Sequence, residues 1–256
     1  MKLKLLGTGT SGGVPVLGCR CEVCQSDDAR DKRLRCVLLV ETEGSRVLVD
    51  CGPDIRQQLL GEPFRRIDGV LITHSHYDHV AGIDDLRPYC AFGDIDLYAR
   101  QDTAQALRRA MPYCFTDTLY PGVPLLRLHE IRPHQSFLIG DIPVLPIEVM
   151  HGQWPILGYR LGALAYITDM KTMAETELAY LQGVDTLIVN ALRFEKPHHS
   201  HQLVADAIRF ARRLGVRRTI FVHMTHQIGL HSAANGRLPE GFEFGYDGME
   251  IHLPLV

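Results

Sequence analysis

Residues 70–79 read Val-Leu-Ile-Thr-His-Ser-His-Tyr-Asp-His. The first four residues form a short apolar run, which predicts a buried strand. The other six place three imidazoles and one carboxylate in the spacing His-x-His-x-Asp-His. In a turn, donors two residues apart can face one metal ion while the last two face a neighbouring ion, and zinc, manganese and iron all accept such donors. A cluster of this density predicts a metal or catalytic site rather than a solvated loop.

Three more predicted strands end in residues of the same chemistry. Apolar runs lead directly into His151, Asp169 and His223, as the first run leads into His74. If these strand ends share one edge of a sheet, their side chains converge on a single cleft, which is where α/β proteins usually place binding sites. The sequence therefore predicts one site assembled from four strand ends.

Alternation of short apolar runs with helical stretches predicts an α/β protein with a large sheet content. The predicted strands are Lys2–Leu6, Val37–Glu41, Arg46–Val49, Val70–Thr73, Asp96–Tyr98, Val144–Val149, Ala165–Thr168, Thr186–Val189 and Thr219–Val222. The predicted helices are Asp54–Leu60, Thr103–Arg109, Met173–Leu181 and Gln202–Leu214. Thr172, three residues before Glu175, would open the third helix as a capping box.

Composition limits the class of protein. The 256 residues are 46% hydrophobic and 22% charged with a formal net charge of -3, as in ordinary globular proteins. No linker-like stretch divides the chain, so one domain over residues 1–256 is expected. No apolar window approaches the roughly 20 residues of a membrane span, and no signal-like stretch follows Met1, so a cytoplasmic location without membrane partners is expected. The slight acidity argues against a large nucleic-acid partner, which needs clustered Lys and Arg, and leaves a small anionic substrate open.

A second cluster is formed by cysteines. Cys19, Cys21 and Cys24 have the spacing C-x-C-x-x-C, and the odd total of 7 cysteines argues against a disulfide framework. Three thiols and one histidine would make a closed structural zinc site, for which His226 is the best fourth ligand. The alternative is three reduced cysteines in a loop. A zinc-binding loop is therefore expected at about residues 14–35. The other four are expected to be small core residues, namely Cys36, Cys51, Cys90 and Cys114.

The segment His-x-His-x-Asp-His resembles the signature of the metallo-β-lactamase superfamily. The resemblance implies an αββα sandwich, in which two mixed β-sheets are flanked by helices and a dinuclear metal site lies at one edge. It implies that one ion is held by His74, His76 and His151, and the other by Asp78, His79 and His223, with Asp169 bridging the two.

Asp50 follows a predicted strand in the segment Val-Leu-Val-Asp-Cys-Gly. It matches a family position near the metal site that does not usually bind the metal. Two roles are considered: Asp50 orients a metal ligand, or it caps a turn beside Gly52.

The cysteine loop, the His/Asp segment and His-x-x-His at 223–226 together resemble the PhnP-type cyclic phosphodiesterases, as do residues 14–19 and 238–251. The resemblance implies hydrolysis of a small phosphodiester, such as a cyclic ribosyl or nucleotide-like one, by attack of a metal-bridging hydroxide. It implies two active-site ions, zinc or manganese, one structural zinc and a homodimer. The activity would be that of a phosphoric diester hydrolase.

Relatives in this branch use one further histidine that precedes a helix near the scissile phosphate. His201 matches this position best because it directly precedes the helix expected to begin at Gln202, and His198 and His199 are the alternatives. An imidazolium there would donate to a phosphoryl oxygen or protonate the leaving alkoxide. Helix capping is the alternative role for His201. The residues expected to be catalytic are His201 and Asp78.

Two arginines of the basic stretch 30–35, Arg33 and Arg35, could grip a phosphate or form a solvated face. The residues expected to bind substrate are Arg35 from this stretch and His198 from the histidine segment before the helix.

Rival functions predict different sequence features. Thioester, lactone or β-lactam hydrolysis on the same fold would not need the His201 region. A tRNA or mRNA nuclease would need a basic arm or an inserted domain. A non-catalytic, metal-stabilised accessory protein predicts broken ligand positions, whereas all seven are filled here.

Overall fold

The computed structural model describes residues 1–116 and 121–254. Two seven-stranded sheets stack face to face, with strand orders β14-β1-β2-β3-β4-β5-β6 and β13-β12-β11-β10-β9-β8-β7. The first sheet contains β14 (Glu250–His252), β1 (Lys2–Gly7), β2 (Val37–Glu41), β3 (Arg46–Val49), β4 (Gly69–Leu71), β5 (Ile95–Arg100) and β6 (Leu126–Ile131). The second contains β13 (Phe242–Phe244), β12 (Arg218–Val222), β11 (Thr186–Asn190), β10 (Leu164–Ile167), β9 (Trp154–Leu161), β8 (Ile142–His151) and β7 (Phe137–Ile139).

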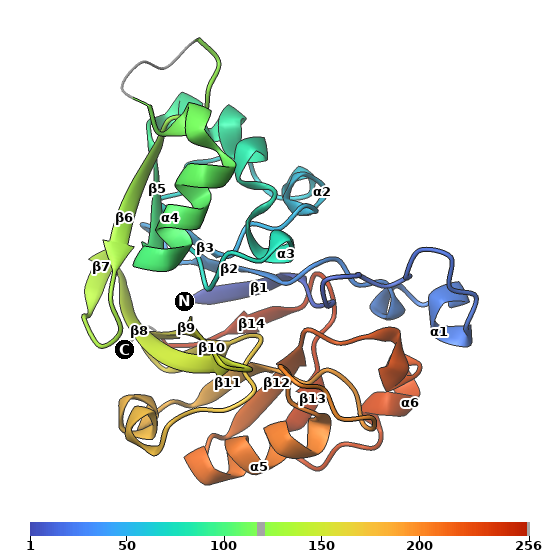
Figure 1. Cartoon of the computed structure of the whole chain (residues 1–256). Coiled ribbons are helices and arrows are strands. Elements are labelled where there is room, and N and C mark those ends of the chain that lie inside the picture. Colours follow the sequence, from blue (N-terminus) through green and yellow to red (C-terminus); the bar gives the residue numbers. More distant parts are fainter. Residues whose placement is uncertain (117–120, 255–256) are drawn as a thin grey trace.

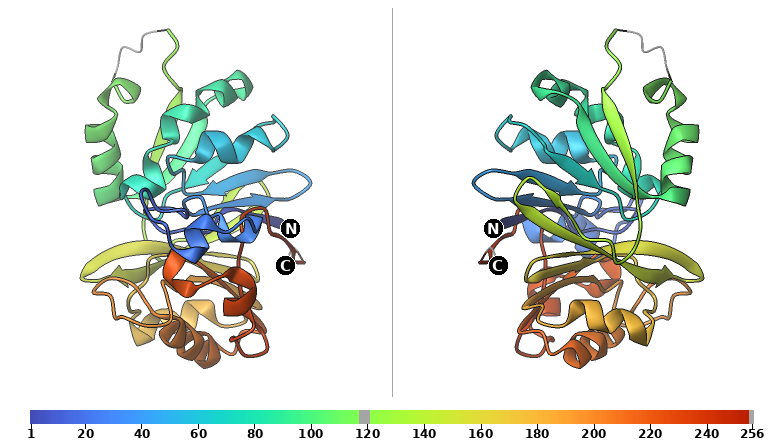
Figure 2. Two further views of the ribbon diagram at one scale, coloured as in Figure 1. Left: turned by 90° about the vertical axis from the view of Figure 1, so that its right-hand side faces the viewer. Right: turned by 90° about the vertical axis from the view of Figure 1, so that its left-hand side faces the viewer.

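Helices cover the outer face of each sheet, so the molecule has four layers (Figure 1). The α-helices are α1 (Glu22–Gln25), α2 (Ile55–Leu60), α3 (Tyr77–Val80), α4 (Gln101–Ala110), α5 (Val204–Leu214) and α6 (His231–Asn235). The 3-10 helices are η1 (Ala29–Asp31), η2 (Ile83–Phe92), η3 (Pro112–Cys114), η4 (Glu175–Leu181) and η5 (His226–Ile228). Figure 2 shows the same layering from both sides, with α2 to α4 against one sheet and α5 against the other. The predicted αββα sandwich is confirmed.

The central strands of both sheets are buried on both faces, which explains why these strands are nearly continuous apolar runs. The inner faces form one core, to which Leu3, Leu38, Tyr159 and Ile220 contribute. The outer face of the first sheet packs against α2, η2 and α4. The outer face of the second sheet packs against α5, whose buried residues recur with helical spacing: Val204, Ala207, Phe210 and Ala211.

All nine predicted strands are present, but five others were missed. Of these, β6, β7, β13 and β14 are the edge strands of the two sheets, and β7, β13 and β14 have only three residues each. The strand β9 contains Pro155 and Gly158, which are typical of turns and rare in strands, so its sequence does not predict a strand.

Two predictions about helices are wrong. Residues 175–181 form a 3-10 helix that begins after Ala174, and Thr172 pairs with Met150 instead of opening a capping box. The helix α5 begins at Val204 rather than Gln202, because the Asp206 carboxylate accepts a hydrogen bond from the backbone N–H of Leu203.

Strand directions bring the candidate ligands to one edge. The strands β3 and β4 are parallel neighbours, and so are β10, β11 and β12. The strand β9 is antiparallel to both β8 and β10, so β8 and β10 run in the same direction. Because parallel strands end at the same edge, the chain segments that follow them meet there. Within the part of the chain that the structure describes, no helix has the length and apolar character needed to cross a bilayer.

Candidate metal centre

Seven side chains from the strand ends form two adjoining groups of potential metal donors. The donor atoms within each group lie within 4.8 Å of one another. The first group is His74, His76, His151 and Asp169, and the second is Asp78, His79, Asp169 and His223. Asp169 belongs to both groups. The structure therefore brings together the seven residues in the same two sets, with the same shared carboxylate, that the family resemblance implied.

Asp50 connects the two donor groups through its hydrogen bonds. Its carboxylate lies 2.7 Å from Nδ1 of His79 and accepts hydrogen bonds from the backbone N–H and the hydroxyl of Thr73. The Thr73 hydroxyl lies 3.0 Å from Nδ1 of His74 and, as a donor to Asp50, can accept from that ring. These contacts turn the Nε2 atoms of both histidines toward the donor groups. Of the two roles considered for Asp50, orienting a candidate ligand is the one its contacts support.

Three residues at this edge have a left-handed backbone. The φ angles are 66° for Asp50, 58° for Asp169 and 57° for His223, in a region that L-residues rarely adopt. Each residue lies just beyond the end of a strand. Such conformations persist where surrounding contacts enforce them, and they are typical of functional sites. At this edge they turn the side chains away from the alternating strand pattern.

The chemistry of the second group fits a bound cation. Nε2 of His79 is buried and has no hydrogen-bond partner, although carboxylate oxygens of Asp78 and Asp169 lie 3.2 Å and 3.6 Å away. Burial disfavours the charged form of His79, yet Asp50 and Asp169 raise its pKa well above the ordinary value. Two buried carboxylates facing imidazole nitrogens thus attract positive charge, which a divalent metal ion would supply.

His201 lies beside both groups. Its ring centroid is 4.8 Å from the rings of His151 and His223, and its Nδ1 is 4.0 Å from a carboxylate oxygen of Asp169. It does not cap α5, which begins three residues later. Burial, followed by the charge of His223, lowers the pKa of His201 to about 3. The free imidazole is therefore neutral near pH 7 and offers one N–H donor.

Hydrogen bonds hold the loop that carries His201 against the segment that follows β10. Nζ of Lys171 donates to the backbone carbonyls of His198 and His201, at 2.8 Å and 3.1 Å. The His198 ring lies 4.9 Å from the His201 ring, and His199 contacts His198 at 4.4 Å. Of the three histidines, His201 is thus the one whose ring lies against candidate ligands of the metal centre.

The two arginines of the basic stretch have different surroundings. Arg33 is only 2% exposed and donates to the Thr8 hydroxyl and the Gly245 carbonyl, so both roles considered for it, phosphate binding and a solvated face, are wrong. Its side chain is used inside the protein. Arg35 donates to both carboxylate oxygens of Asp54 and to the carbonyl of Ser11, and its role in substrate binding stays a prediction.

The cysteine cluster closes on His226. The Sγ atoms of Cys19, Cys21 and Cys24 lie 3.4, 3.1 and 3.5 Å from Nδ1 of His226. All four donors form one potential metal site. The backbone N–H of Cys24 and then the His226 ring favour the thiolate and lower the pKa of Cys21 to about 6, whereas burial raises that of Cys24 to about 11. A cation would stabilise all three thiolates.

The remaining cysteines are free thiols, as expected. Three of them are buried in the core, namely Cys36, Cys51 and Cys114. Cys90 differs from the prediction: it is only half-buried, and its Sγ accepts a hydrogen bond from the backbone N–H of Leu125.

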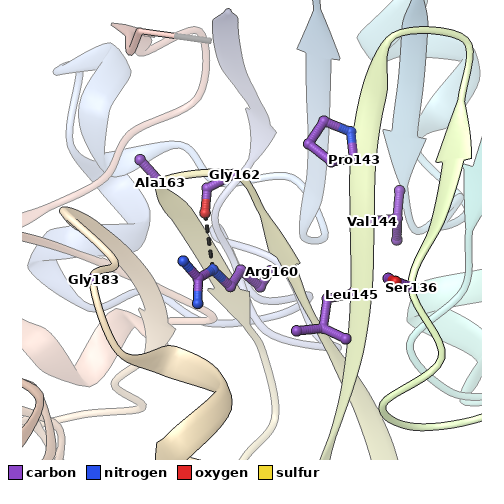
Figure 3. A pocket seen from close by; sticks show the side chains of 8 residues that line it. All are labelled: Ser136, Pro143, Val144, Leu145, Arg160, Gly162, Ala163 and Gly183. Carbon is purple, nitrogen blue, oxygen red and sulfur yellow. Dashed lines mark hydrogen bonds between the residues drawn. The ribbon is translucent and has the colours of Figure 1, made fainter. Parts of the chain in front are cut away.

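A cavity of about 280 Å³ lies at the opposite end of the second sheet (Figure 3). It is lined by Gly162 and Ala163, which precede β10, whereas Asp169 follows that strand. The guanidinium of Arg160 donates to the carbonyls of Gly162 and Tyr180. This cavity is therefore separate from the candidate metal centre.

Comparison with known proteins defines the class. Residues 45–224 match the family described as the β-lactamase superfamily domain, and the chain belongs to that family. A solved structure described as a new diphosphatase from the PhnP family has 35% sequence identity and a TM-score of 0.90, covering 98% of this chain and 96% of that chain. Human tRNase Z, short form, shares the fold, with a TM-score of 0.73, 20% identity and coverage of 99% and 100%.

Two curated relatives extend the comparison. Coenzyme PQQ synthesis protein B of Methylobacterium nodulans is 40% identical, over 99% of this chain and 100% of that protein. A protein named octanoyltransferase, from Porphyromonas gingivalis, is 43% identical over 98% of this chain. The chain spans about half of that relative, 51% of its length. The family, the fold and the clustered donors together support a metal-dependent hydrolase.

Proposed function

We propose that this chain hydrolyses a small phosphodiester with the help of two divalent metal ions. The observation that carries the proposal is the pair of donor groups that share Asp169, with His201 beside them. A carboxylate common to two ion sites suits a reaction in which both ions act on one substrate group. Similarity to the PhnP-family diphosphatase supports phosphorus as the centre of attack.

The proposed centre uses His74, His76 and His151 for one ion and Asp78, His79 and His223 for the other, with Asp169 between them. These nitrogen and oxygen donors suit zinc and manganese alike. When bound, two such ions lower the pKa of water and neutralise phosphoryl oxygens. The protein's part is to hold the donors: Asp50 fixes the His79 ring, and the carbonyl of Asp169 lies 2.7 Å from Nδ1 of His151.

The proposed role of His201 follows from its protonation. As a neutral imidazole it would donate its one N–H to a phosphoryl oxygen. The negative charge of a bound phosphodiester would raise the pKa of the ring and favour proton transfer to the leaving alkoxide. Lys171 is a positioning residue in this scheme, because it holds the loop that carries His201.

Substrate would approach past His76, the exposed member of the first group. Its ring centroid lies 5.2 Å from that of Trp154, whose indole N–H donates to the carboxylate of Asp102. An imidazole and an indole fixed at the entrance suit a compact organic ester.

A structural zinc at the cysteine cluster completes the proposed set of metals. The single domain, the homodimer and the cytoplasmic location stay predictions.

The similarity to octanoyltransferase favours a second candidate, hydrolysis of an acyl thioester. Metal centres of this kind also polarise carbonyl oxygens. The chain matches about half of that relative, so the acyltransferase activity belongs to the whole relative. The presence of His201 beside both donor groups favours phosphoryl chemistry over this alternative.

The test is hydrolysis of bis(p-nitrophenyl) phosphate by protein reconstituted with zinc or manganese, with octanoyl coenzyme A as the thioester arm. We expect p-nitrophenol release that falls at least about a hundredfold in Asp78→Ala, because a ligand is lost. The matched control is Asp27→Ala, which changes an exposed aspartate. Absence of turnover in the wild type, or undiminished turnover in Asp78→Ala, would overturn the proposal. Turnover of the thioester alone would favour the second candidate.

A further inference from the structure

The cavity of about 280 Å³ at the far end of the second sheet has a charged residue among apolar ones (Figure 3). Arg160 of β9 is the cross-strand partner of Leu145 on β8 and of Ala165 on β10. Cross-strand partners place their side chains on the same face of a sheet, and Ala165 belongs to the core beneath α5. Arg160 therefore lies on the outer face of the sheet, in an otherwise apolar row.

The walls of the cavity are mostly apolar. Pro143 and Leu145 of β8 form one wall, and the turns at residues 162–163 and at Gly183 form the other, with Arg160 between them (Figure 3). The apolar surface continues beyond this rim, because Leu138 of β7 is the cross-strand partner of Pro143 and its side chain is 66% exposed. A short apolar chain would therefore bury surface here.

Arg160 is fixed in place with part of its guanidinium free. Its Nε donates to the carbonyl of Gly162 at 3.0 Å, and its Nη1 donates to the carbonyl of Tyr180 at 2.9 Å. Within residues 1–116 and 121–254, Nη2 has no hydrogen-bond or ion-pair partner. The two N–H groups of Nη2 are thus available to a ligand, and their fixed position lowers the entropy cost of binding.

The positive charge of Arg160 has no carboxylate partner in the part of the chain that the structure describes. By contrast, Arg217 forms an ion pair of 2.8 Å with Asp185, two residues after Gly183. A Cβ atom at Gly183 would lie 3.9 Å from Nη2 of Arg160, so the glycine leaves room beside the free donor. An unpaired cation in an apolar hollow attracts an anion.

The surroundings of Arg160 favour one class of anion. Of the described residues that line the cavity, only Ser136 offers another side-chain donor, a hydroxyl. A carboxylate has two oxygens, and it forms strong charge-assisted hydrogen bonds with a guanidinium. A phosphate has more oxygens, and they would face apolar walls without donors. The chemistry of the cavity therefore suits a carboxylate better than a phosphate.

We propose that this cavity binds a small monocarboxylic acid with a short apolar chain. The carboxylate accepts hydrogen bonds from Nη2 of Arg160, and the chain lies against Pro143 and Leu145. The site goes beyond the proposed hydrolysis and does not depend on it, because the cavity and Asp169 lie at opposite ends of β10.

The test is titration of ¹⁵N-labelled, zinc-loaded protein with hexanoate, followed by NMR. We expect saturable shifts of the backbone amide signals of residues 162–163 and Gly183. Butanoate should bind about tenfold more weakly, since each buried methylene contributes a factor of about three to four. Hexan-1-ol has the same chain without the charge, and it should also bind at least about tenfold more weakly.

These titrations of the wild type decide the proposal without any substitution. Shifts confined to signals around the metal centre would mean that hexanoate binds there alone, and would overturn the proposal. Absence of saturable shifts would overturn it as well. Equal affinity for hexanoate and hexan-1-ol would show that Arg160 does not bind the carboxylate.

Arg160→Met removes the cation and should lower the affinity for hexanoate at least about tenfold, to the level of hexan-1-ol. Thermal unfolding checks that the variant is folded, because Arg160 also holds the Tyr180 carbonyl. Arg109→Met is the matched control, since Arg109 is exposed on α4, which packs on the other sheet. It should bind hexanoate like the wild type. A folded Arg160→Met with wild-type affinity would overturn the proposal.

Leu145→Ala tests the apolar wall and leaves Arg160 in place. The half-buried leucine contributes contact surface to the chain of the ligand. We expect the preference for hexanoate over butanoate to fall at least about threefold in this variant. An unchanged preference would place the chain outside the cavity and contradict the assignment.

Discussion

A single buried residue, Asp50, connects the two halves of the candidate metal centre. It contacts His79 of one donor group directly and reaches His74 of the other through the Thr73 hydroxyl. Carboxylates that accept from a ligand histidine fix its tautomer and increase its basicity. Asp50 is fully buried, so water cannot replace it in this role.

Asp50→Asn should therefore weaken both metal sites. The amide would present N–H groups either to His79 or to Thr73, where the carboxylate accepts from both. We expect a loss of metal affinity of about 10- to 100-fold, measured by metal content after dialysis against a weak chelator. Asp94→Asn, at an ion pair of 3.8 Å with Arg127, is the control and should keep its metals. Unchanged metal content in Asp50→Asn would contradict the role of Asp50.

The raised pKa of the Asp247 carboxyl group predicts that the free energy of unfolding depends on pH. Its carboxylate accepts hydrogen bonds from the Thr8 hydroxyl and the Leu34 backbone N–H, and burial raises its pKa to about 6. An unfolded chain has an aspartate pKa near 4. Between about pH 4 and 6 the folded state binds more protons than the unfolded state, so this group's contribution to stability falls as the pH rises.

Asp247→Asn removes this titration. Relative to the wild type, the free energy of unfolding of the variant should rise by roughly 1–2 kcal/mol from pH 4 to 6.5, a figure reduced by the partial exposure of Asp247. Urea unfolding at several pH values measures it. Glu43→Gln, at an exposed bend, should keep a constant offset from the wild type. A constant offset for Asp247→Asn as well would show that Asp247 does not titrate in this window.

At the scale of single residues, the sequence predicts which side chains could bind a metal better than it predicts the surroundings of a side chain. His74 and Asp169 could be found because a metal needs specific residue types directly after strands. Arg33 and Arg35 looked alike in the sequence, yet Arg33 is buried, whereas Arg35 is half-buried and paired with Asp54. A pocket of about 300 Å³ beside Arg193 escaped prediction, because Gln227 and Arg237, which also line it, come from distant segments of the chain.

At the scale of elements, burial on both faces made the central strands predictable. The parallel strands β10 to β12 are continuous apolar runs, and all of them were predicted. The edge strand β6 reads Leu-Arg-Leu-His-Glu-Ile, and its polar side chains are exposed, so its apolar signal is weak. The turn after β10 was read as the start of a helix because its pairing with β8 is not visible in the sequence.

Gly52 holds the helix α3 against the end of β3. A Cβ atom at Gly52 would lie 2.2 Å from the carbonyl oxygen of Asp78, closer than any real contact. Backbone hydrogen bonds from Cys51 to His79 and from Gly82 to Cys51 prevent an easy shift. The close approach positions the segment that carries Asp78 and His79.

Gly52→Ala should therefore displace two candidate ligands. We expect lower metal content and at least about a hundredfold less activity, since small misplacements of reacting groups have large kinetic costs. Gly61→Ala is the matched control, because no atom lies within 4 Å of its Cβ position. Metal counting together with the phosphodiesterase assay checks both variants. Full activity in Gly52→Ala would show that this contact does not position the ligands.

At the scale of the whole molecule, distant parts of the sequence close on each other. The strand β14 pairs with β1, and the terminal amine of Met1 donates to the carbonyl of Leu253. In the left view of Figure 2, the helix α1 lies beside the helix α6. It also contacts η5, which precedes α6 in the chain. The cysteine cluster joins the same regions, because Cys21 and His226 are 205 residues apart. A metal bound there would act as a cross-link between the two ends of the fold.

This cross-link predicts a loss of stability without a metal. Cys21→Ser should lose one of three bound ions, counted by mass spectrometry of the metals. Closing a long loop reduces the entropy of the unfolded chain, so we expect a cost of roughly 2–4 kcal/mol and a Tm lower by about 5–15 °C. Cys90→Ser is the control, because a hydroxyl can keep the hydrogen bond from Leu125. If Cys21→Ser keeps all three ions and the wild-type Tm, the cysteine cluster is not a structural metal site. Residual activity in a destabilised Cys21→Ser that has lost one ion would separate this site from the centre around Asp169.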